Sequence, residues 1–189
     1  MKKIKKSKTK NLTLFFVNIY IRQFLTMTHL STNFTLEELI HSNNAKSKGL
    51  KNEPNESQIE NLKLLAQYIL EPIREKIGCP LFISSGFRSE KVNALVGGSK
   101  TSQHLLGQAA DIQIFDKKLT NKDLFDIIVE MVKNNELQVG QVIWEFGEDV
   151  PNWVHVSLPT SRHRNEIMRA SNVYDKHISK FKTVYTRIS

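Results

Sequence analysis

The sequence predicts one domain of the α+β class, in which helices and antiparallel strands are mixed. The chain has 189 residues, of which 40% are hydrophobic, and this is enough to bury the core of a single domain. Helical periodicity and strand alternation both occur, without the regular strand–helix–strand rhythm of a parallel sheet. Two alternating segments, residues 141–146 and 153–158, are separated only by turn residues, which predicts an antiparallel hairpin.

The first half of the domain is expected to be helical. Thr35 followed by Glu38 has the spacing of a capping box, so a helix is predicted to begin directly after Thr35. Residues 45–56 are polar and include glycine and proline, which indicates a loop. Residues 57–70 place apolar side chains at helical spacing, and the helix is expected to extend past Pro72 or to kink there.

The second half is expected to mix short strands with helices. We predict a strand at 81–85, a brief helix at 92–96, a strand at 109–115, a helix at 119–134 and then the hairpin. Neither an internal repeat nor a low-complexity tract interrupts this body. The sequence therefore predicts one continuous fold.

Charge divides the chain into three parts. The net charge is +8, but residues 1–26 hold seven basic and no acidic side chains, residues 27–160 hold 13 basic and 17 acidic, and residues 161–189 hold seven basic and two acidic. We expect an N-terminal extension, a mildly acidic domain and a basic C-terminal tail with these boundaries. Basic ends attract polyanions without identifying one, and solvated tails are the simpler interpretation, so nucleic-acid binding is not expected.

Residues 1–26 allow three interpretations. A lysine-rich run followed by an apolar segment is typical of a secretion signal, but Asn18 and Arg22 interrupt the apolar part and no small-residue cleavage site follows. The segment is alternatively an amphipathic helix that contacts a membrane. A third interpretation makes Met27 the true start and the preceding residues an extension without a role in the fold.

One ten-residue segment and one later strand carry the strongest chemical signal. His104, Asp111 and His155 offer two imidazoles and one carboxylate, which is the donor set of a catalytic zinc site that keeps a position open for water. Because Cys79 is the single cysteine, a metal must be held by such residues. The other histidines have no matching context and are expected at the surface: His29, His41, His163 and His177.

The spacing between His104 and Asp111 indicates how the two residues meet. On a helix they would lie about 10.5 Å apart along the axis, too far to share one metal through bonds of about 2 Å. Gly107 between them predicts a loop that turns into a strand and folds His104 back beside Asp111. His155 alternates with valines along its own strand, so it is expected on the polar face.

These residues carry a family resemblance. The pattern Ser102-x-His104-x-x-Gly107-x-Ala109-x-Asp111 with a downstream Trp-x-His resembles the zinc D-Ala-D-Ala carboxypeptidases of the peptidase M15 family. The run Ser-Ser-Gly-Phe-Arg-Ser at 84–89 is similar to the Ser-Gly-Phe/Tyr-Arg segment of that family, and residues 33–38 most resemble its phage endolysin branch. The resemblance covers about residues 34–158. It implies a hedgehog/DD-peptidase-like fold, with a central antiparallel sheet flanked by helices.

The resemblance also implies a role for each site residue. His104, Asp111 and His155 would be the ligands of a Zn²⁺ ion. Arg88 would contact a substrate carboxylate or the developing oxyanion, and Ser102 would line the same pocket. The implied activity is that of a metallopeptidase that hydrolyses peptide bonds in peptidoglycan stem peptides, as a D-Ala-D-Ala carboxypeptidase or a related endopeptidase.

The catalytic base departs from the family pattern. Well-known members place Glu or Asp three residues before the last histidine, where this chain has Asn152, and an amide cannot accept a proton from the attacking water. If the hairpin turn is centred near Val150, Glu145 lies opposite His155 with Cβ atoms about 5 Å apart, and Glu145 is then the expected base. Asp149 in the turn is the second candidate.

Two functional hypotheses follow from this departure. Either Glu145 replaces the missing base and the chain is an active zinc peptidase, or the chain is a zinc-stabilised module that binds the cell wall without hydrolysis. The expected partner is the peptidoglycan stem peptide, and the protein is expected to be a monomer. It is expected to act at the bacterial cell wall after export or release on lysis, with residues 161–189 as a loose tail or a wall-affinity segment.

Overall fold

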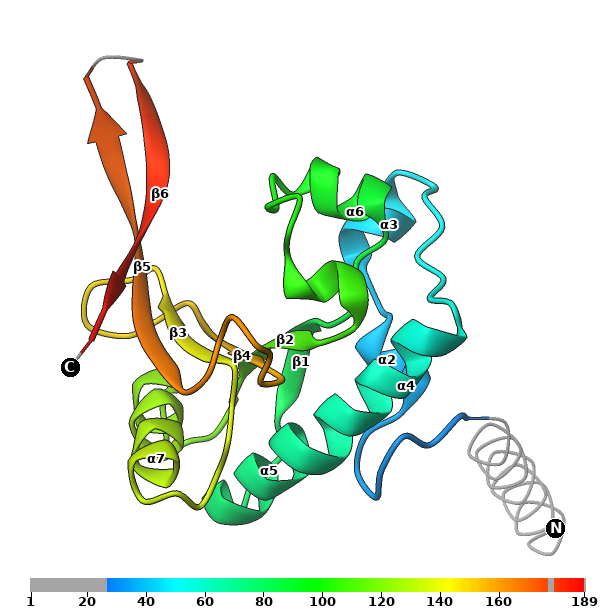
Figure 1. The fold of residues 1–189 in the computed structure, drawn as a ribbon, viewed down its shortest axis with the longest axis horizontal. Coiled ribbons are helices and arrows are strands. Elements are labelled where there is room, and N and C mark those ends of the chain that lie inside the picture. The colour runs from blue at the N-terminus through cyan, green and yellow to red at the C-terminus, as the bar shows by residue number, and fades with distance from the viewer. Residues whose placement is uncertain (1–26, 177–178, 189) are drawn as a thin grey trace, which may run out of the picture.

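A six-stranded sheet forms the centre of the fold in this computed structural model, which describes residues 27–176 and 179–188 (Figure 1). The strand order is β1-β2-β4-β3-β5-β6. Every neighbouring pair is antiparallel except β3 and β5, so the α+β class is confirmed and the sheet is mixed. The strands are β1 Phe82–Ser85, β2 Ala109–Gln113, β3 Gln141–Glu145, β4 Trp153–Ser157, β5 Glu166–Asp175 and β6 Lys180–Arg187.

The helices of the described residues lie before β1, β2 and β3 along the chain. They are α2 Leu36–Leu39, α3 Asn43–Ser47, α4 Glu56–Leu65, α5 Glu71–Ile77, α6 Glu90–Leu95 and α7 Asn121–Lys133, with a π-helical turn η1 Ala66–Leu70 and a 3₁₀ turn η2 Gln103–Leu106. In this part of the chain, no helix has the length and apolar character needed to cross a bilayer. The expectations for residues 1–26 and for His177 concern positions outside the described residues.

The long helical segment α4–η1–α5 shows how local sequence sets the structure. Asn55 caps α4 through a reciprocal pair of hydrogen bonds with Gln58, at 2.7 and 3.0 Å. The segment continues past Pro72, as predicted. The π turn ends at Leu70, two residues before this proline, which lacks an N–H and crowds the preceding turn. The loop expected at 45–56 is wrong at its start, because Ser42 caps the short helix α3 with its side chain.

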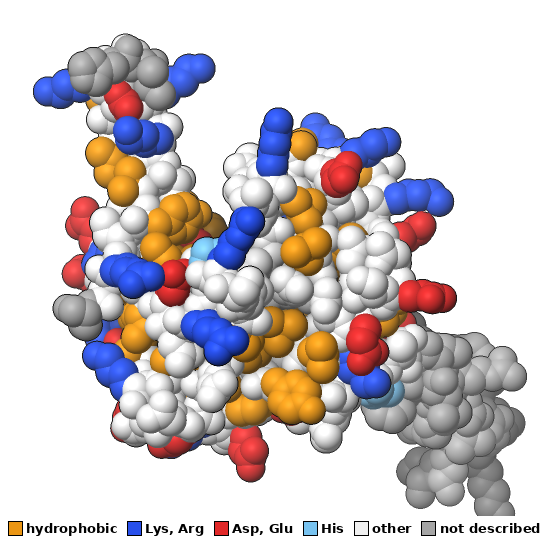
Figure 2. Space-filling model, in the orientation of Figure 1, with side chains coloured by type: hydrophobic (Ala, Val, Ile, Leu, Met, Phe, Trp, Pro, Cys, Tyr) orange, Lys and Arg blue, Asp and Glu red, His pale blue; other side chains and the backbone are white. Residues whose placement is uncertain are grey.

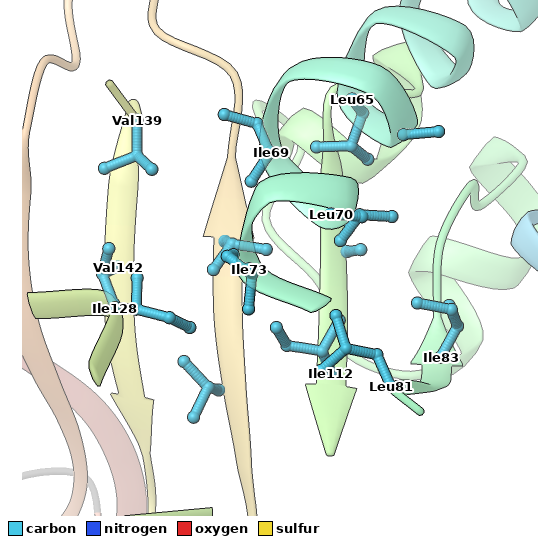
Figure 3. Packing of buried hydrophobic residues seen from close by; sticks show 14 of the residues in the cluster. Leu65, Ile69, Leu70, Ile73, Leu81, Ile83, Ile112, Ile128, Val139 and Val142 are labelled. Carbon is cyan, nitrogen blue, oxygen red and sulfur yellow. The ribbon is translucent and has the colours of Figure 1, made fainter. Parts of the chain in front are cut away.

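The core lies between one face of the sheet and the helices. Figure 3 shows side chains of the α4–η1–α5 segment, such as Leu70 and Ile73, packed with Ile112 of β2 and with Ile83 of β1. A side chain of this kind stabilises the fold by about 1.5–3 kcal/mol when fully buried. Alternate residues of the central strands supply this face, so the intervening residues point to the opposite side.

Strands β5 and β6 form a hairpin, here named the β5–β6 arm, where the sequence analysis expected a tail. β5 pairs in parallel with β3, and β6 pairs with β5 over the whole length of the hairpin. Figure 1 shows the arm extending well beyond the rest of the sheet. The chain after residue 160 therefore continues the central sheet. Periodicity did not indicate these strands because most of the arm is exposed on both faces, which removes the alternation of apolar and polar residues.

Candidate metal and catalytic site

Two site residues lie directly opposite each other on neighbouring strands. Asp111 in β2 is paired with His155 in β4, on the face of the sheet that points away from the core. Val154 and Val156 on either side of His155 belong to the core. The polar face expected for His155 is therefore the face on which the structure places it, and regular strand pairing is enough to bring the two side chains together.

The turn η2 brings His104 to the same place. Ser102 begins this turn, and its Oγ accepts a hydrogen bond from the His104 N–H at 3.4 Å. Gly107 ends it with a φ of 69°, and a Cβ at this position would lie 2.5 Å from the carbonyl oxygen of Gln58. Glycine is thus required for both the left-handed backbone and the close approach. The chain folds His104 back toward Asp111, as the sequence indicated.

The three side chains converge on one small volume. Oδ1 of Asp111 lies 3.2 Å from Nε2 of His104 and 3.0 Å from Nδ1 of His155, and these two nitrogens are 3.2 Å apart. All three residues are buried, and the atoms that each would offer to a metal lie within 4.8 Å of one another. Burial of so many polar atoms around one point is costly unless a cation or protons compensate their lone pairs.

The chemistry of this donor set fits zinc. His104 donates from Nδ1 to the carbonyl oxygen of Gly86 at 2.7 Å, which leaves the Nε2 lone pair directed at the cluster, as is usual for histidines that bind metals. Burial alone would raise the pKa of Asp111, but the charges and hydrogen bonds of His104 and His155 hold it well below its usual range, so the carboxylate is ionised. Two imidazole nitrogens and one carboxylate oxygen are therefore available to a zinc ion.

Arg88 braces the carboxylate that completes this cluster. Its guanidinium forms an ion pair with Oδ2 of Asp111, and its Nε donates to Oγ of Ser85 at 2.8 Å. Its backbone N–H also donates to the carbonyl oxygen of His104 at 3.1 Å. Arg88 therefore fixes the carboxylate with Oδ1 toward the histidines, a contact that the sequence analysis did not anticipate.

Glu145 is the additional carboxylate on this face. It is the last residue of β3, with 7% of its surface exposed. Burial raises the pKa of Glu145 from its ordinary value of 4.5 to about 7, while the charge of His155 opposes the rise and that of Asp111 adds to it. A carboxylate with a pKa near neutrality is suited to accept and return a proton.

The predicted register of the hairpin is wrong by two residues, although the predicted face is right. Glu145 pairs with Trp153, and Ile143 is the residue opposite His155. The turn is centred one residue earlier than expected because Phe146 and Gly147 both adopt left-handed backbone angles, with φ of 58° and 68°. A shift of two residues keeps every side chain on its own face, so Glu145 is a diagonal neighbour of His155.

Asp149, the second candidate base, and Asn152, where the family pattern has its base, lie in or beside the turn. Asp149 is exposed in the loop between β3 and β4. Asn152 is also exposed, and its backbone N–H donates to the carbonyl oxygen of Glu145 at 3.0 Å. Its own carbonyl oxygen accepts from the side chain of Gln113 at 2.7 Å. Asn152 thus helps to fix the strand end that carries Glu145.

Comparison with protein families agrees with this geometry. The model of the family described as Peptidase M15 matches residues 32–157, about two thirds of the chain. The chain belongs to the peptidase M15 family. A comparison with curated proteins finds no match. The matched region contains the whole cluster and Glu145, and ends before the β5–β6 arm.

Membership of the peptidase M15 family supports a zinc-dependent metallopeptidase that acts on peptidoglycan-type substrates in general. The buried His104, Asp111 and His155 cluster can bind such a metal. Sequence reasoning missed the support around the cluster, namely the carbonyl oxygen of Gly86 and the bond between Arg88 and Ser85. Residues 84–89 could be assigned to the site only through their family motif. Their contact with β2 could not be predicted, because it depends on how segments distant in sequence pair.

Proposed function

We propose that the protein is a zinc peptidase that hydrolyses a peptide bond in peptidoglycan stem peptides, as a D-Ala-D-Ala carboxypeptidase or as a related endopeptidase of the phage endolysin type. The convergence of His104, Asp111 and His155 beside the buried Glu145 carries this proposal. The family match is consistent with it. Hydrolysis of a peptide bond by this route requires a metal cation and a general base close together. The face of the sheet that points away from the core offers residues for both.

The residues divide the reaction between them. His104, Asp111 and His155 hold the ion, which when bound polarises the scissile carbonyl and lowers the pKa of water toward about 7. Glu145 accepts a proton from the attacking water and returns it to the leaving amine, so that no net proton is consumed by the protein. Glu145 thereby takes the role that the amide of Asn152 cannot perform.

Arg88 has a double role in this proposal. Its bonds to Asp111 and Ser85 orient a proposed metal ligand. Its remaining N–H groups are proposed to bind a terminal carboxylate of the substrate or the developing oxyanion. Ser102 is proposed to line the same pocket, and it begins the turn that carries His104. The partial exposure of Arg88, 17% for its side chain, is consistent with contact to a bound peptide.

Mass spectrometry of a peptidoglycan digest tests this function. Zinc-loaded wild-type protein should release D-Ala or split the stem peptide, and a chelator should stop the reaction. The variant His104→Ala should give no product, whereas His41→Ala, which removes an exposed histidine that bonds Asn43, should leave the product yield unchanged. Failure of the wild-type protein to form any product across a full pH series would refute the proposal.

A second candidate function keeps the metal and omits the reaction. It is favoured by Asn152, which stands where the family pattern has a carboxylate. A zinc-stabilised module of this kind would bind cell walls, and Glu145→Gln would bind walls and zinc as well as the wild type while neither protein formed product. The digest described above separates the two functions.

The place of action follows from the substrate. We propose that the protein acts at the bacterial cell wall as a monomer, after export or after release on lysis, and that any membrane contact is confined to residues 1–26. Nucleic acid is not a proposed partner, because the basic residues are concentrated at the two ends of the chain and the domain between them is mildly acidic.

A further inference from the structure

The β5–β6 arm continues the row of residues that contains the proposed catalytic base. Glu145 of β3 pairs with Ala170 of β5, and Ala170 pairs with Tyr185 of β6. Residues that are directly paired point to the same face of a sheet, so Tyr185 lies on the face that holds the metal cluster. Strands are about 4.8 Å apart, which puts the Tyr185 backbone about 10 Å from Glu145. Ala170 between them is small and leaves room for the tyrosine ring.

The electrostatics of Tyr185 agree with this placement. Burial raises the pKa of the Tyr185 phenol, and the charges of Glu145 and Asp111 raise it further. Half of Tyr185, 51% of its surface, is nevertheless exposed, so the ring can contact a bound molecule.

The same face of the arm carries further aromatic residues toward its tip. Tyr174 and Phe181 are directly paired, with ring centroids 5.3 Å apart in an edge-to-face arrangement, and 49% and 70% of their surfaces are exposed. Between this pair and Tyr185 lie Asn172 and Thr183, whose side chains are 3.2 Å apart. We name Tyr174, Phe181 and Tyr185 the aromatic strip. It is about 14 Å long, given a rise of about 3.4 Å per residue.

An open hollow lies beside the arm. Figure 2 shows the molecule hollowed between the arm and the lobe that holds α3 and α6, with hydrophobic side chains on the arm beside the hollow. In the same orientation, Figure 1 places β2, β3 and β4 below it. A two-stranded ribbon twists along its length, so the strip winds as it leaves the site. The hollow gives a chain-like ligand room to lie alongside the arm.

We propose that the aromatic strip is a binding subsite for the glycan strand of peptidoglycan, and that it holds the polymer while an attached stem peptide enters the site. This inference rests on the proposed function for its substrate, but the subsite itself binds sugar with or without hydrolysis. The strip lies outside the region that the family model matches, so the subsite is an addition to the catalytic domain.

The chemistry of the strip favours a sugar polymer. Aromatic rings carry negative charge on their faces, to which the slightly positive C–H groups on the face of a sugar ring are attracted. The amide of Asn172 and the hydroxyl of Thr183 offer hydrogen bonds to sugar hydroxyls in the interval between the rings. Rings separated by polar side chains match a chain of rings with polar edges better than they match a continuous apolar surface of a second copy or a lipid bilayer.

Binding to peptide-free glycan strands tests the subsite directly. The full-length protein, treated with a chelator, should co-sediment with insoluble glycan from which the stem peptides have been removed. The double variant Tyr174→Ala/Phe181→Ala should bind at least about tenfold more weakly, as expected for the loss of two stacked rings. Val173→Ala is the matched control, because Val173 lies on the opposite face of the same arm with 46% of its surface exposed.

Kinetics on two substrates then connects the subsite to the reaction. For the double variant, the ratio of kcat/KM on glycan-linked stem peptide to kcat/KM on the free stem peptide should fall about tenfold, through KM. Val173→Ala should keep the wild-type ratio. Equal losses on both substrates would overturn the subsite, since they would place the effect at the catalytic centre or in folding.

The remaining outcomes are also decisive. Unchanged glycan binding by the double variant, or wild-type protein that does not bind peptide-free glycan, overturns the subsite whether or not the protein is a peptidase. A wild-type dimer in light scattering that the double variant converts to monomer assigns the strip to self-association instead. Glycan binding without turnover on either substrate supports the subsite and counts against the proposed function alone.

Discussion

The two faces of the central sheet are built from the same strands and differ in what they bury. On the core face, Ile112 and Val154 pack against the helices, and burial of apolar area stabilises the fold. On the opposite face, Asp111 and His155 are also buried, among charged and polar groups. Burial therefore has opposite consequences one residue apart along a strand. It provides stability on the first face, and on the second it creates strong electrostatic interactions at a cost in stability.

The role of a residue in these strands therefore depends on the face of the sheet to which its side chain points, and not on its position along the strand. Asp111 and Ile112 are neighbours in β2, and both are almost inaccessible to solvent. Substitution of one should impair chemistry, and substitution of the other should impair stability.

Removal of the charge at Asp111 should have the largest effect. Asp111→Ala deletes the central member of the proposed metal-binding cluster and leaves Arg88 without its ion-pair partner, so zinc retention should be lost and turnover should fall by at least about 1000-fold. Elemental analysis after dialysis measures the zinc, and the stem-peptide assay measures turnover. Retention of one zinc per chain by this variant would break the assignment of the site.

The neighbouring core substitution should act on stability instead. Ile112→Ala leaves a cavity under the helices and should lower the free energy of unfolding by about 2–5 kcal/mol. Zinc content and turnover per folded molecule should stay within about twofold of the wild type, because the side chain points away from the site. Urea unfolding measures the free energy of unfolding. A large loss of turnover in fully folded protein would show that the two faces of the sheet are not independent.

Features of the fold that depend on nearby residues could be predicted from the sequence, whereas features that depend on distant residues could not. The alternation of His155 with valines predicted its face, and Gly107 predicted the turn that returns His104 to Asp111, because both depend on nearby residues. The hairpin register depended on the left-handed angles of Phe146 and Gly147, which sequence alternation does not encode. The β5–β6 arm was missed because its exposed faces lack contrast, and the pairing of β5 with β3 joins residues distant in sequence.

Glu145 should make the metal-free fold less stable as the pH rises. Its folded pKa of about 7 lies above the ordinary 4.5, so the folded state keeps a proton that the unfolded state loses, and stability present below pH 4.5 is lost as the pH rises through 7. Glu145→Gln removes this dependence. We expect chelator-treated Glu145→Gln to be more stable than wild type by about 1–3 kcal/mol at pH 8 and equally stable at pH 4.5. An equal difference at both pH values would mean that the carboxyl is not buried as described.

The brace around Asp111 should have the smallest effect. In Arg88→Lys the charge remains, but an ammonium cannot bond Asp111 and Ser85 in the same planar arrangement, so zinc affinity should fall about 10- to 100-fold. Competition with a fluorescent zinc chelator measures the affinity. Arg187→Lys is the control, since it alters an exposed ion pair with Glu166 far from any ligand in sequence, and it should bind zinc like the wild type. Equal affinities for all three proteins would remove Arg88 from the support of the site.

The most direct test measures zinc content and turnover on the same preparations of wild-type protein and Glu145→Gln. Both proteins should hold one zinc per chain, because Glu145 is not among the proposed zinc ligands. The variant should hydrolyse stem peptide about 100- to 10,000-fold more slowly than the wild type, because it lacks the proposed base. Equal turnover by the two zinc-loaded proteins, or wild-type protein that binds no zinc, would contradict the account.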